Sequence, residues 1–180
     1  MQGWKNQGIH GRDAGCGQGT LGGVINELPD PVLTQVYGLK AVMGPPQDFG
    51  DALAGHRVTV PLVGGVFTGP ELNGNLLPGG SVSWQIALPD GTALAEVRYT
   101  LQTERGALLY VRSSGVGRGS REVAARLGRG EAVDPGEHLF HAVTHIETAA
   151  PYLDWLNKGV FVTVAGRTAV HMLYETYLVG

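Results

Sequence analysis

The fold of this chain is decided by residues 81–101, which read SVSWQIALPDGTALAEVRYTL. Apolar and polar residues alternate over 81–86 and again over 95–101, which is typical of a strand with one buried face. Between the two runs, Pro89 and Gly91 take the second and fourth positions of a turn, with Asp90 between them. The stretch therefore predicts two strands joined by a tight turn.

The same pattern continues outward in both directions. Apolar runs bounded by Gly and Pro predict further strands at 32–42, 58–63, 107–112, 138–147, 158–164 and 168–178. One helix is expected over 120–127, capped by Ser120, and a helical turn over 151–157. Eight or more strands with short connections predict an all-β, antiparallel β-barrel or β-sandwich with one short helix. A closed barrel is favoured because it leaves no strand edge unpaired.

Composition and charge limit the classes of function. Of the 180 residues 43% are apolar and 16% charged, as in a globular protein, and the length suits one barrel domain over 29–180. Residues 1–28 show neither periodicity and are predicted to form an arm that is flexible or packs on a partner. A net charge of −3 argues against nucleic acid or an anionic membrane as partner. Cys16 is the only cysteine, and no run of 18 apolar residues occurs, so we expect a cytoplasmic protein.

Several segments resemble one family of proteins. Residues 60–85 read VPLVGGVFTGPELNGNLLPGGSVSWQ, and RYTL at 98–101, GALLYV at 106–111 and WLN at 155–157 follow in order. Over about residues 31–180 the chain resembles the microbial family known as domain of unknown function three-two-three-seven. The resemblance implies a calycin-like barrel that tends to form homo-oligomers.

This chain departs from the family pattern at chemically important positions. Ser83 stands where the family usually has Asp before Trp, and His141 and His145 stand at positions that are usually arginine. Because of these departures, the resemblance alone does not assign an activity of other family members to this chain. They also suit a specialised member with its own substrate.

The departures fall in a stretch that could carry acid–base chemistry. On a strand, His141, His145 and Glu147 share one face, and Glu147 could raise the basicity of a neighbouring imidazole. Arg98 could hold a carboxylate or stabilise an enolate oxygen. We predict these four residues as catalytic. The predicted substrate-binding residues are Trp84, Tyr99, Phe67 and Ser83.

The leading hypothesis is a cofactor-independent cyclase, isomerase or dehydratase for a polyketide-like or oxygenated hydrophobic substrate, as in natural product biosynthesis. The alternative is a lipocalin-like protein that binds a small apolar ligand without catalysis, if the polar face is simply the outer surface of the sheet. A third hypothesis is an oligomer subunit whose polar face is the interface. If Arg98, His141 and Glu147 converge in one cavity, the enzyme hypothesis gains; if they face bulk water, it fails.

A metal site is a further alternative for the same residues. His141, His145 and Glu147 could together ligate zinc or iron, with His171 as a remote fourth ligand. His138 would point to the opposite side of the strand. Because the pattern matches no known metal motif, no metal and no cofactor are predicted.

Overall fold

The computed structural model describes residues 28–129, 131, 133–168 and 170–180. The arm predicted over 1–28 lies, except for its last residue, outside the described residues. The chain divides into one unit over Met1–Asp30 and a compact unit over Pro31–Gly180. Every strand of the described chain belongs to the second unit.

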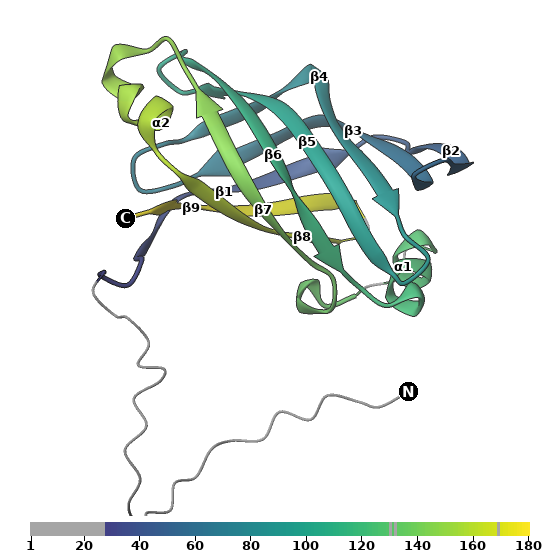
Figure 1. Cartoon of the computed structure of the whole chain (residues 1–180). Helices are drawn as coiled ribbons and strands as arrows, with labels where there is room; N and C mark the ends of the chain where they lie inside the picture. Colours follow the sequence, from purple (N-terminus) through teal and green to yellow (C-terminus); the bar gives the residue numbers. More distant parts are fainter. Residues whose placement is uncertain (1–27, 130, 132, 169) are drawn as a thin grey trace, which may run out of the picture. The chain divides into compact units, whose positions relative to one another are not determined.

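The strands of the second unit close into a barrel (Figure 1). They follow the order β1-β9-β8-β7-β6-β5-β4-β3-β2 with every pairing antiparallel, and β1 also pairs with β3. Eight strands therefore form a closed ring, and β2 extends one end of β3 as a hairpin. This confirms the predicted antiparallel barrel. The strands are β1 Leu33–Met43, β2 Gln47–Ala52, β3 Gly55–Thr68, β4 Gly74–Ala87, β5 Thr92–Thr103, β6 Leu108–Arg118, β7 Leu139–Glu147, β8 Phe161–Arg167 and β9 His171–Val179.

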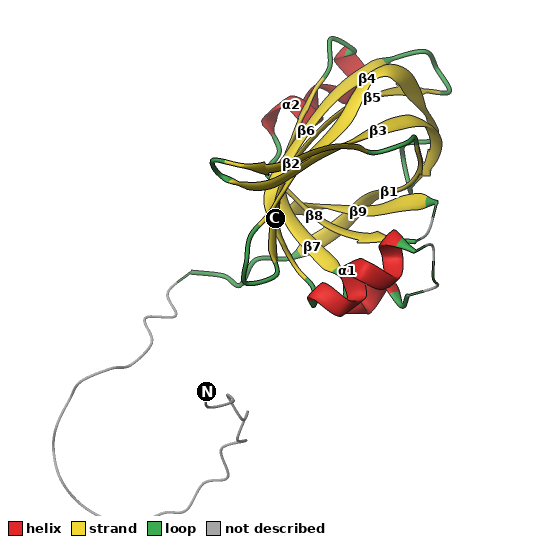
Figure 2. Ribbon diagram, turned by 90° about the vertical axis from the view of Figure 1, so that its right-hand side faces the viewer, coloured by secondary structure: helices red, strands yellow, loops and turns green. Residues whose placement is uncertain are grey.

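Short helices lie at the two ends of the barrel (Figure 2). At one end are α1, Arg121–Gly128, and the 3-10 turn η1, Pro135–Glu137. At the other end are the 3-10 turn η2, Pro151–Leu153, and α2, Asp154–Lys158. The hydroxyl of Ser120 accepts a hydrogen bond from the Val123 amide at 3.1 Å, which confirms the predicted cap.

The turn that decides the fold is formed as expected. The Gly91 amide donates to the Leu88 carbonyl at 3.0 Å, and the Asp90 carboxylate accepts from the Thr92 amide at 2.9 Å. The bond to Asp90 fixes the turn locally, since an Asp side chain at this place mimics a backbone acceptor. β4 and β5 are consequently held in one register along residues 82–87 and 93–98.

The strand predicted over 58–63 is longer than the sequence suggested. The two glycines after Val63 were expected to end it, but β3 continues through Gly64 and Gly65 to Thr68. The physical reason is that β3 changes its neighbours here and passes very close to β1. A Cβ on Gly65 would lie 2.5 Å from the Lys40 carbonyl oxygen, so only glycine allows the approach. β2 was not predicted at all.

This close approach gives a matched pair of substitutions. Gly64 and Gly65 have φ of 158° and 159°, so an alanine meets the same backbone preference at either position. Around Gly64 no atom lies within 4 Å of an added Cβ, whereas Gly65 meets the backbone of β1. We expect Gly65→Ala to lower the free energy of unfolding by about 1–3 kcal/mol more than Gly64→Ala, the usual cost of overpacking. Urea denaturation of both variants measures the difference, and equal losses would contradict the close packing of β3 on β1.

The barrel interior contains a polar layer among apolar ones. Above and below it lie buried side chains such as Leu39, Phe67, Leu101 and Phe161. The polar layer is a belt of fully or almost fully buried hydroxyl groups from six strands, which we call the hydroxyl ring. Its members are Tyr37, Tyr99, Ser113, Thr144, Thr163 and Thr176.

The hydroxyl ring links neighbouring strands in sequence. The Thr144 hydroxyl lies 2.7 Å from those of Ser113 and Thr163, and the Thr163 hydroxyl lies 3.0 Å from that of Thr176. The two tyrosine hydroxyls lie 3.1 Å apart, and hydrogen-bonding interactions also link one of them to Thr176 and the other to Ser113. Since each hydroxyl has one proton to donate, six groups supply one donor for each link of the cycle. The ring therefore satisfies polar groups that would otherwise be costly to bury.

Candidate functional site

The four residues predicted as catalytic lie on the outer face of the barrel. Along β7, His141, His145 and Glu147 are exposed, whereas Ala142, Thr144 and Ile146, which alternate with the exposed residues, are buried. This parity follows from the strand itself, because successive side chains point to opposite faces. The three residues share one face, as the alternation requires, but that face points to water.

Arg98 is also on the outer face and is engaged there. Its guanidinium forms an ion pair with Glu96 at 2.5 Å and lies 5.7 Å from the centre of the Trp84 ring. Through the register of β5, β6 and β7, Arg98 stands beside Arg112, and Arg112 beside His145. Arg98 and His145 are thus two strand spacings apart, about 10 Å. Trp84 is a neighbour of Arg98 and not a wall of the interior.

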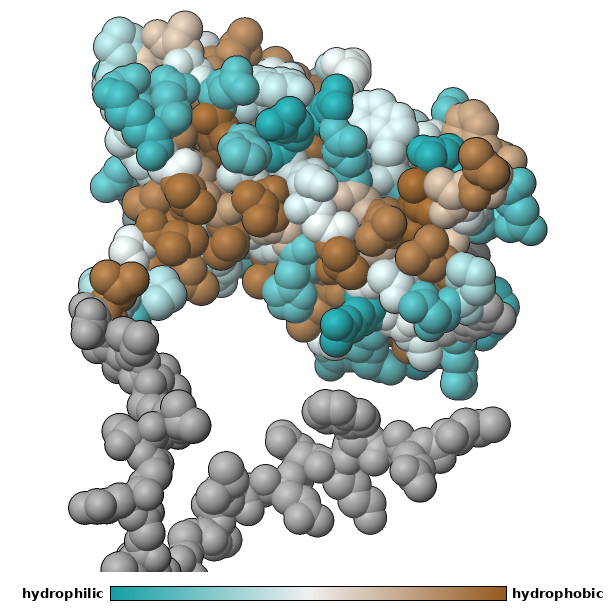
Figure 3. All heavy atoms as spheres, viewed as in Figure 1, coloured by the Kyte–Doolittle hydropathy of each residue, from teal (hydrophilic) through white to brown (hydrophobic). Residues whose placement is uncertain are grey.

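The outer face offers open hollows to only some of these residues: Glu147 lines one of about 830 Å³ and Trp84 another of about 460 Å³, and neither includes Arg98, His141 or His145. Exposed apolar side chains, among them Leu94, Val116 and Val143, stand between the polar ones. Figure 3 shows the mixture of hydrophobic and hydrophilic residues on the face that carries β5–β7. Within the described parts of the chain, no three His, Cys, Asp or Glu side chains lie close enough together to hold a metal ion. The ligand set considered from the sequence therefore does not assemble there.

Three of the predicted substrate-binding residues point into the barrel. Phe67 and Tyr99 are buried in the core, where the Phe67 ring packs edge-on against Tyr37 at 5.7 Å. Ser83 is also buried, and its hydroxyl accepts a hydrogen bond from the side-chain Nε2 of Gln85 at 3.1 Å. Of the three, Ser83 lines a cavity.

That cavity lies inside the barrel at the end that carries α1, and we call it the barrel-end cavity. Its volume is about 50 Å³, enough for one or two water molecules or a small polar group. Its walls are partly apolar, with Val97, Phe140 and Met172 among them. The polar side chains that line it are Ser83, Gln85, His138, Arg167 and Tyr174.

Three side chains that line the barrel-end cavity each carry a buried polar atom that lacks a hydrogen-bond partner among the described residues. These atoms are His138 Nδ1, Arg167 Nε and the Tyr174 hydroxyl, and no other side-chain atom of the described residues shares this condition. Buried polar atoms are almost always paired, because an unpaired one costs about 1–3 kcal/mol. Three such residues around one small cavity make it the candidate site for a polar ligand.

Burial also sets the protonation of these groups. Desolvation, and then the positive charge of Arg167, hold the pKa of His138 below its usual value. Desolvation lowers the pKa of Arg167 and raises the pKa of Tyr174. At neutral pH the cavity therefore presents a neutral imidazole, a protonated phenol and one positive charge. This is the combination needed for a base, a proton donor and a site for a negative oxygen.

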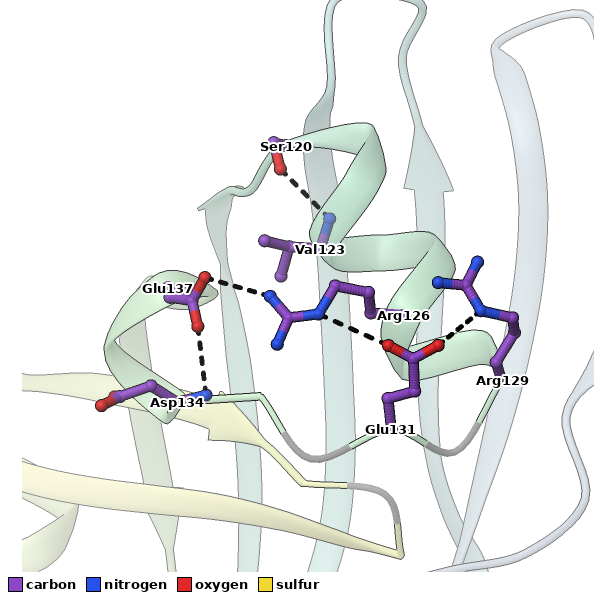
Figure 4. A network of polar contacts seen from close by, with 7 residues as sticks. All are labelled: Ser120, Val123, Arg126, Arg129, Glu131, Asp134 and Glu137. Carbon is purple, nitrogen blue, oxygen red and sulfur yellow. Dashed lines mark hydrogen bonds and ion pairs between the residues drawn. The ribbon is translucent and has the colours of Figure 1, made fainter.

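His138 is positioned by the segment that carries α1 and η1. Figure 4 shows the Glu137 carboxylate between α1 and η1, where it contacts Arg126 at 3.4 Å. Arg126 also lies 3.6 Å from Glu131, which contacts Arg129 at 2.6 Å. These ion pairs tie the segment back on itself just before His138. The imidazole then packs on Gly119, where an added Cβ would lie 2.3 Å from Nδ1.

Arg167 and Tyr174 come from neighbouring strands whose inward positions continue the barrel core. Arg167 ends β8 in line with buried Ala165, and Tyr174 lies on β9 between inward Met172 and Thr176. The Tyr174 ring packs against Tyr99 with 5.7 Å between ring centres. Tyr99, a member of the hydroxyl ring, thus supports the Tyr174 side chain, while the Tyr174 hydroxyl is not itself part of the hydroxyl ring.

A larger depression lies outside the barrel-end cavity, and we call it the outer hollow. Its volume is about 680 Å³, and it is lined by residues 51–56 of the β2–β3 hairpin, by the β4–β5 turn and by Gly119 and Ser120. Ala93 and His138 line both spaces. At its rim His56 contacts Asp48 and Asp51 at 3.0 Å each, and hydrogen bonds to the two carboxylates raise its pKa. A ligand in the outer hollow could therefore reach His138 directly.

The unpaired charge in the barrel-end cavity allows a prediction about stability. Arg167 is half-buried and no ion pair to it occurs among the described residues, so its desolvation is not offset. We expect Arg167→Gln to raise the free energy of unfolding by about 0.5–2 kcal/mol, as often happens when a functional group is removed. Thermal melting of both proteins without ligand tests this. A melting temperature that falls clearly would mean that Arg167 is a structural residue.

Sequence reasoning overlooked the three residues that define the cavity. His138 has the opposite parity to His141 and His145, and that parity is what turns it inward, away from the predicted site. Tyr174 is a buried aromatic residue, and a tyrosine in a strand is usually part of the core. No feature of the sequence indicated that Arg167 is a site residue, since an arginine at the end of a strand is usually a surface residue.

Comparison with known proteins places the chain in a family. Residues 31–179 match the family described as "Protein of unknown function (DUF3237)". The chain belongs to this family. The match covers the whole barrel and confirms the resemblance seen in the sequence, while the family description names no activity.

Solved structures agree with the fold. The chain is 30% identical to a conserved protein of unknown function from Rhodopseudomonas palustris, with a TM-score of 0.79 over 85% of this chain and 100% of that one. A β-barrel-like protein from Acinetobacter baumannii gives 32% identity and a TM-score of 0.74, over 86% of this chain and 99% of that one. An enzyme from Penicillium herquei gives 18% identity and a TM-score of 0.60, over 84% and 99%. The last likeness shows only that the fold is shared.

Proposed function

We propose that this member of the family is a cofactor-independent enzyme that moves protons on a small oxygenated, largely apolar compound bound at the barrel-end cavity. The observation that carries the proposal is the convergence of His138, Arg167 and Tyr174, each with an unpaired buried polar atom among the described residues. The reaction belongs to the isomerase, dehydratase or cyclase type predicted from the sequence. Arg98, His141 and Glu147 face water, so the enzyme hypothesis fails at the residues for which it was made, and the proposal rests on other residues.

The chemistry uses each group for one task. A substrate carbonyl oxygen lies near the Tyr174 hydroxyl and the Arg167 guanidinium, and the C–H next to the carbonyl lies near His138. The neutral imidazole takes that proton, and the electron pair left behind delocalises onto the oxygen as an enolate. Tyr174 and Arg167 stabilise the negative oxygen in a site with little water. The proton on His138 then returns to another position, or protonates a leaving hydroxyl, so that the atoms and charges balance.

Deuterium exchange tests the proton transfer without knowledge of the natural substrate. The protein is incubated in D₂O with fused-ring ketones such as 1-indanone and 1-tetralone, and proton NMR follows loss of the signal next to the carbonyl. We expect exchange above the buffer rate with the wild type and the buffer rate with His138→Gln. His145→Gln is the matched comparison, because the same change is made on the outer face.

The same assay decides between the interior and the outer face. If His145→Gln stops the exchange and His138→Gln does not, the chemistry takes place around the residues predicted from the sequence. The catalytic role of Arg98, His141, His145 and Glu147 stays a prediction until that comparison is made.

A binding protein without catalysis is the second candidate. The apolar walls of the barrel-end cavity, with Val97, Phe140 and Met172, favour it because they would hold an apolar ligand equally well. A carrier binds the ketones without exchanging their protons. Binding measured by calorimetry together with exchange at the buffer rate in every variant would support this function instead.

We also propose that the protein works as a homo-oligomer in the cytoplasm, as its sequence predicts. Exposed Leu94, Val116 and Val143 on the outer face support the first part, because burial of apolar side chains drives association. Light scattering during size-exclusion chromatography measures the oligomeric state, and a monomer at micromolar concentration would contradict it. Among the described residues no helix has the length and apolar character to cross a membrane.

A further inference from the structure

The charge balance of the barrel-end cavity points to the kind of compound that it binds. Arg167 brings a positive charge into the cavity, and its Nε has no partner among the described residues. His138, whose pKa Arg167 lowers, is neutral or positive and cannot compensate the charge. The cavity therefore has an excess positive charge.

The acidic side chains of the surrounding strands do not reach this charge. On β9, Glu175 is exposed and bonded to Gln35, and on β5 Glu96 is paired with Arg98 on the outer face. At the rim of the outer hollow, Asp48 and Asp51 are paired with His56. The alternation of side chains along β9 and β5 directs Glu175 and Glu96 outward, whereas the alternation along β8 directs Arg167 inward. Since no described side chain supplies the missing negative charge, a ligand is the natural source of it.

Two neighbouring spaces set the shape of that ligand. The barrel-end cavity, at about 50 Å³, has room for a group the size of a carboxylate. The outer hollow, at about 680 Å³, has room for a body of one or two rings, and Leu53, Ala54 and Leu88 give it apolar walls. Because Ala93 and His138 line both spaces, the two parts of one molecule could occupy them together.

We propose that the natural ligand carries a carboxylate on an apolar body, with the carboxylate held by Arg167 and the body in the outer hollow. A carboxylate accepts the unpaired N–H of Arg167 and offsets its charge. The inference deepens the proposed function and rests on it. In a reacting substrate the Tyr174 hydroxyl donates to the negative oxygen that forms next to the carbon losing its proton, and the positive charge of Arg167 stabilises the same oxygen from nearby.

A pair of ligands that differ only in charge tests the inference. The probes are 2-naphthoate and 2-naphthamide, whose ring systems are identical, and isothermal titration calorimetry measures both affinities. We expect the wild type to bind the carboxylate about 10–100-fold more tightly than the amide, as is usual for a hydrogen bond to a charged group. Arg167→Gln should remove the preference, and Arg167→Lys should retain part of it because the charge remains.

The control is Arg118→Gln, which makes the same change at an exposed arginine at the end of β6. It should keep the full preference for the carboxylate. Equal affinity of the wild type for the two probes, or a preference that survives Arg167→Gln, would overturn the inference. A preference that also disappears in Arg118→Gln would show only a general effect of surface charge and would overturn it too.

The deuterium exchange assay separates this failure from failure of the proposed function. Exchange that depends on His138, without any preference for the carboxylate, would support the proposed enzyme and contradict the proposed ligand class. A preference that depends on Arg167, without exchange in the wild type or any variant, would support an anion-binding barrel and contradict the proposed enzyme.

Discussion

His138→Gln is expected to lower kcat for the proton transfer by about 10²–10⁴-fold, the usual contribution of a positioned general base. Glutamine keeps a polar side chain of similar reach but cannot take a proton at neutral pH. KM should change far less, because the imidazole is proposed to act on the proton in the transition state and not to anchor the ligand. Steady-state kinetics on the best ketone from the exchange assay measure both constants.

The pH profile of the wild type provides a second test of His138. Its pKa is held below the usual 6.5 by desolvation and by Arg167, so the imidazole is already mostly neutral at pH 6.5 and above. The kcat/KM should therefore be flat from about pH 7 upward and should decrease only at lower pH, when His138 becomes protonated. A rate that decreases as the pH rises through about 6–7 would contradict the assignment of His138 as the base. In that case protonated histidine would act as an acid.

Tyr99→Ala is expected to lower the free energy of unfolding by about 3–5 kcal/mol, the range for truncating a large buried aromatic residue. Two losses combine in this variant. The ring that packs on Tyr174 is removed, and the hydroxyl ring loses the member that contacts Tyr37. Chemical denaturation followed by tryptophan fluorescence measures the change.

Tyr99→Phe separates the two losses. Phenylalanine keeps the aromatic ring and removes only the hydroxyl, which leaves hydrogen-bonding positions of Tyr37 and Ser113 unmet. We expect a loss of about 1–3 kcal/mol, the cost of an unsatisfied buried polar group. If Tyr99→Phe is as stable as the wild type, the hydroxyl ring does not stabilise the barrel. Wild-type affinity for the naphthalene probes in Tyr99→Phe would indicate that Tyr99 belongs to the core and not to the binding site.

Much of the fold could be predicted because alternation and turn chemistry act locally. Residues 81–101 contain both the two-residue period and the Pro-Asp-Gly turn, and the strands and the turn form at these residues, although in 81–86 Ser81 and Ser83 face the interior and Trp84 does not. The continuation of β3 through Gly64 and Gly65 could not be predicted in this way. It depends on the approach of β1, whose contacting residues are distant in the chain. A glycine pair has the same local signature in a turn and at a close crossing of strands.

The site could be predicted only in part, and for a related reason. Alternation shows that His141, His145 and Glu147 share a face, but it does not say which face is inside. The buried neighbours Ala142, Thr144 and Ile146 include two apolar residues and one threonine, so the polar face was the more conspicuous one. The interior polar groups are single residues on different strands, and only barrel closure brings them together.

The central claim is that ligands bind at the barrel-end cavity, and a crystal structure of the protein soaked with 1-tetralone tests it most directly. We predict ordered ligand density with the carbonyl oxygen about 3 Å from the Tyr174 hydroxyl or Arg167 Nε, a normal hydrogen-bond distance. The ring system should lie toward His138 and the outer hollow. Ligand bound only on the outer face beside Arg98 and His145, with none in the cavity, would contradict the claim.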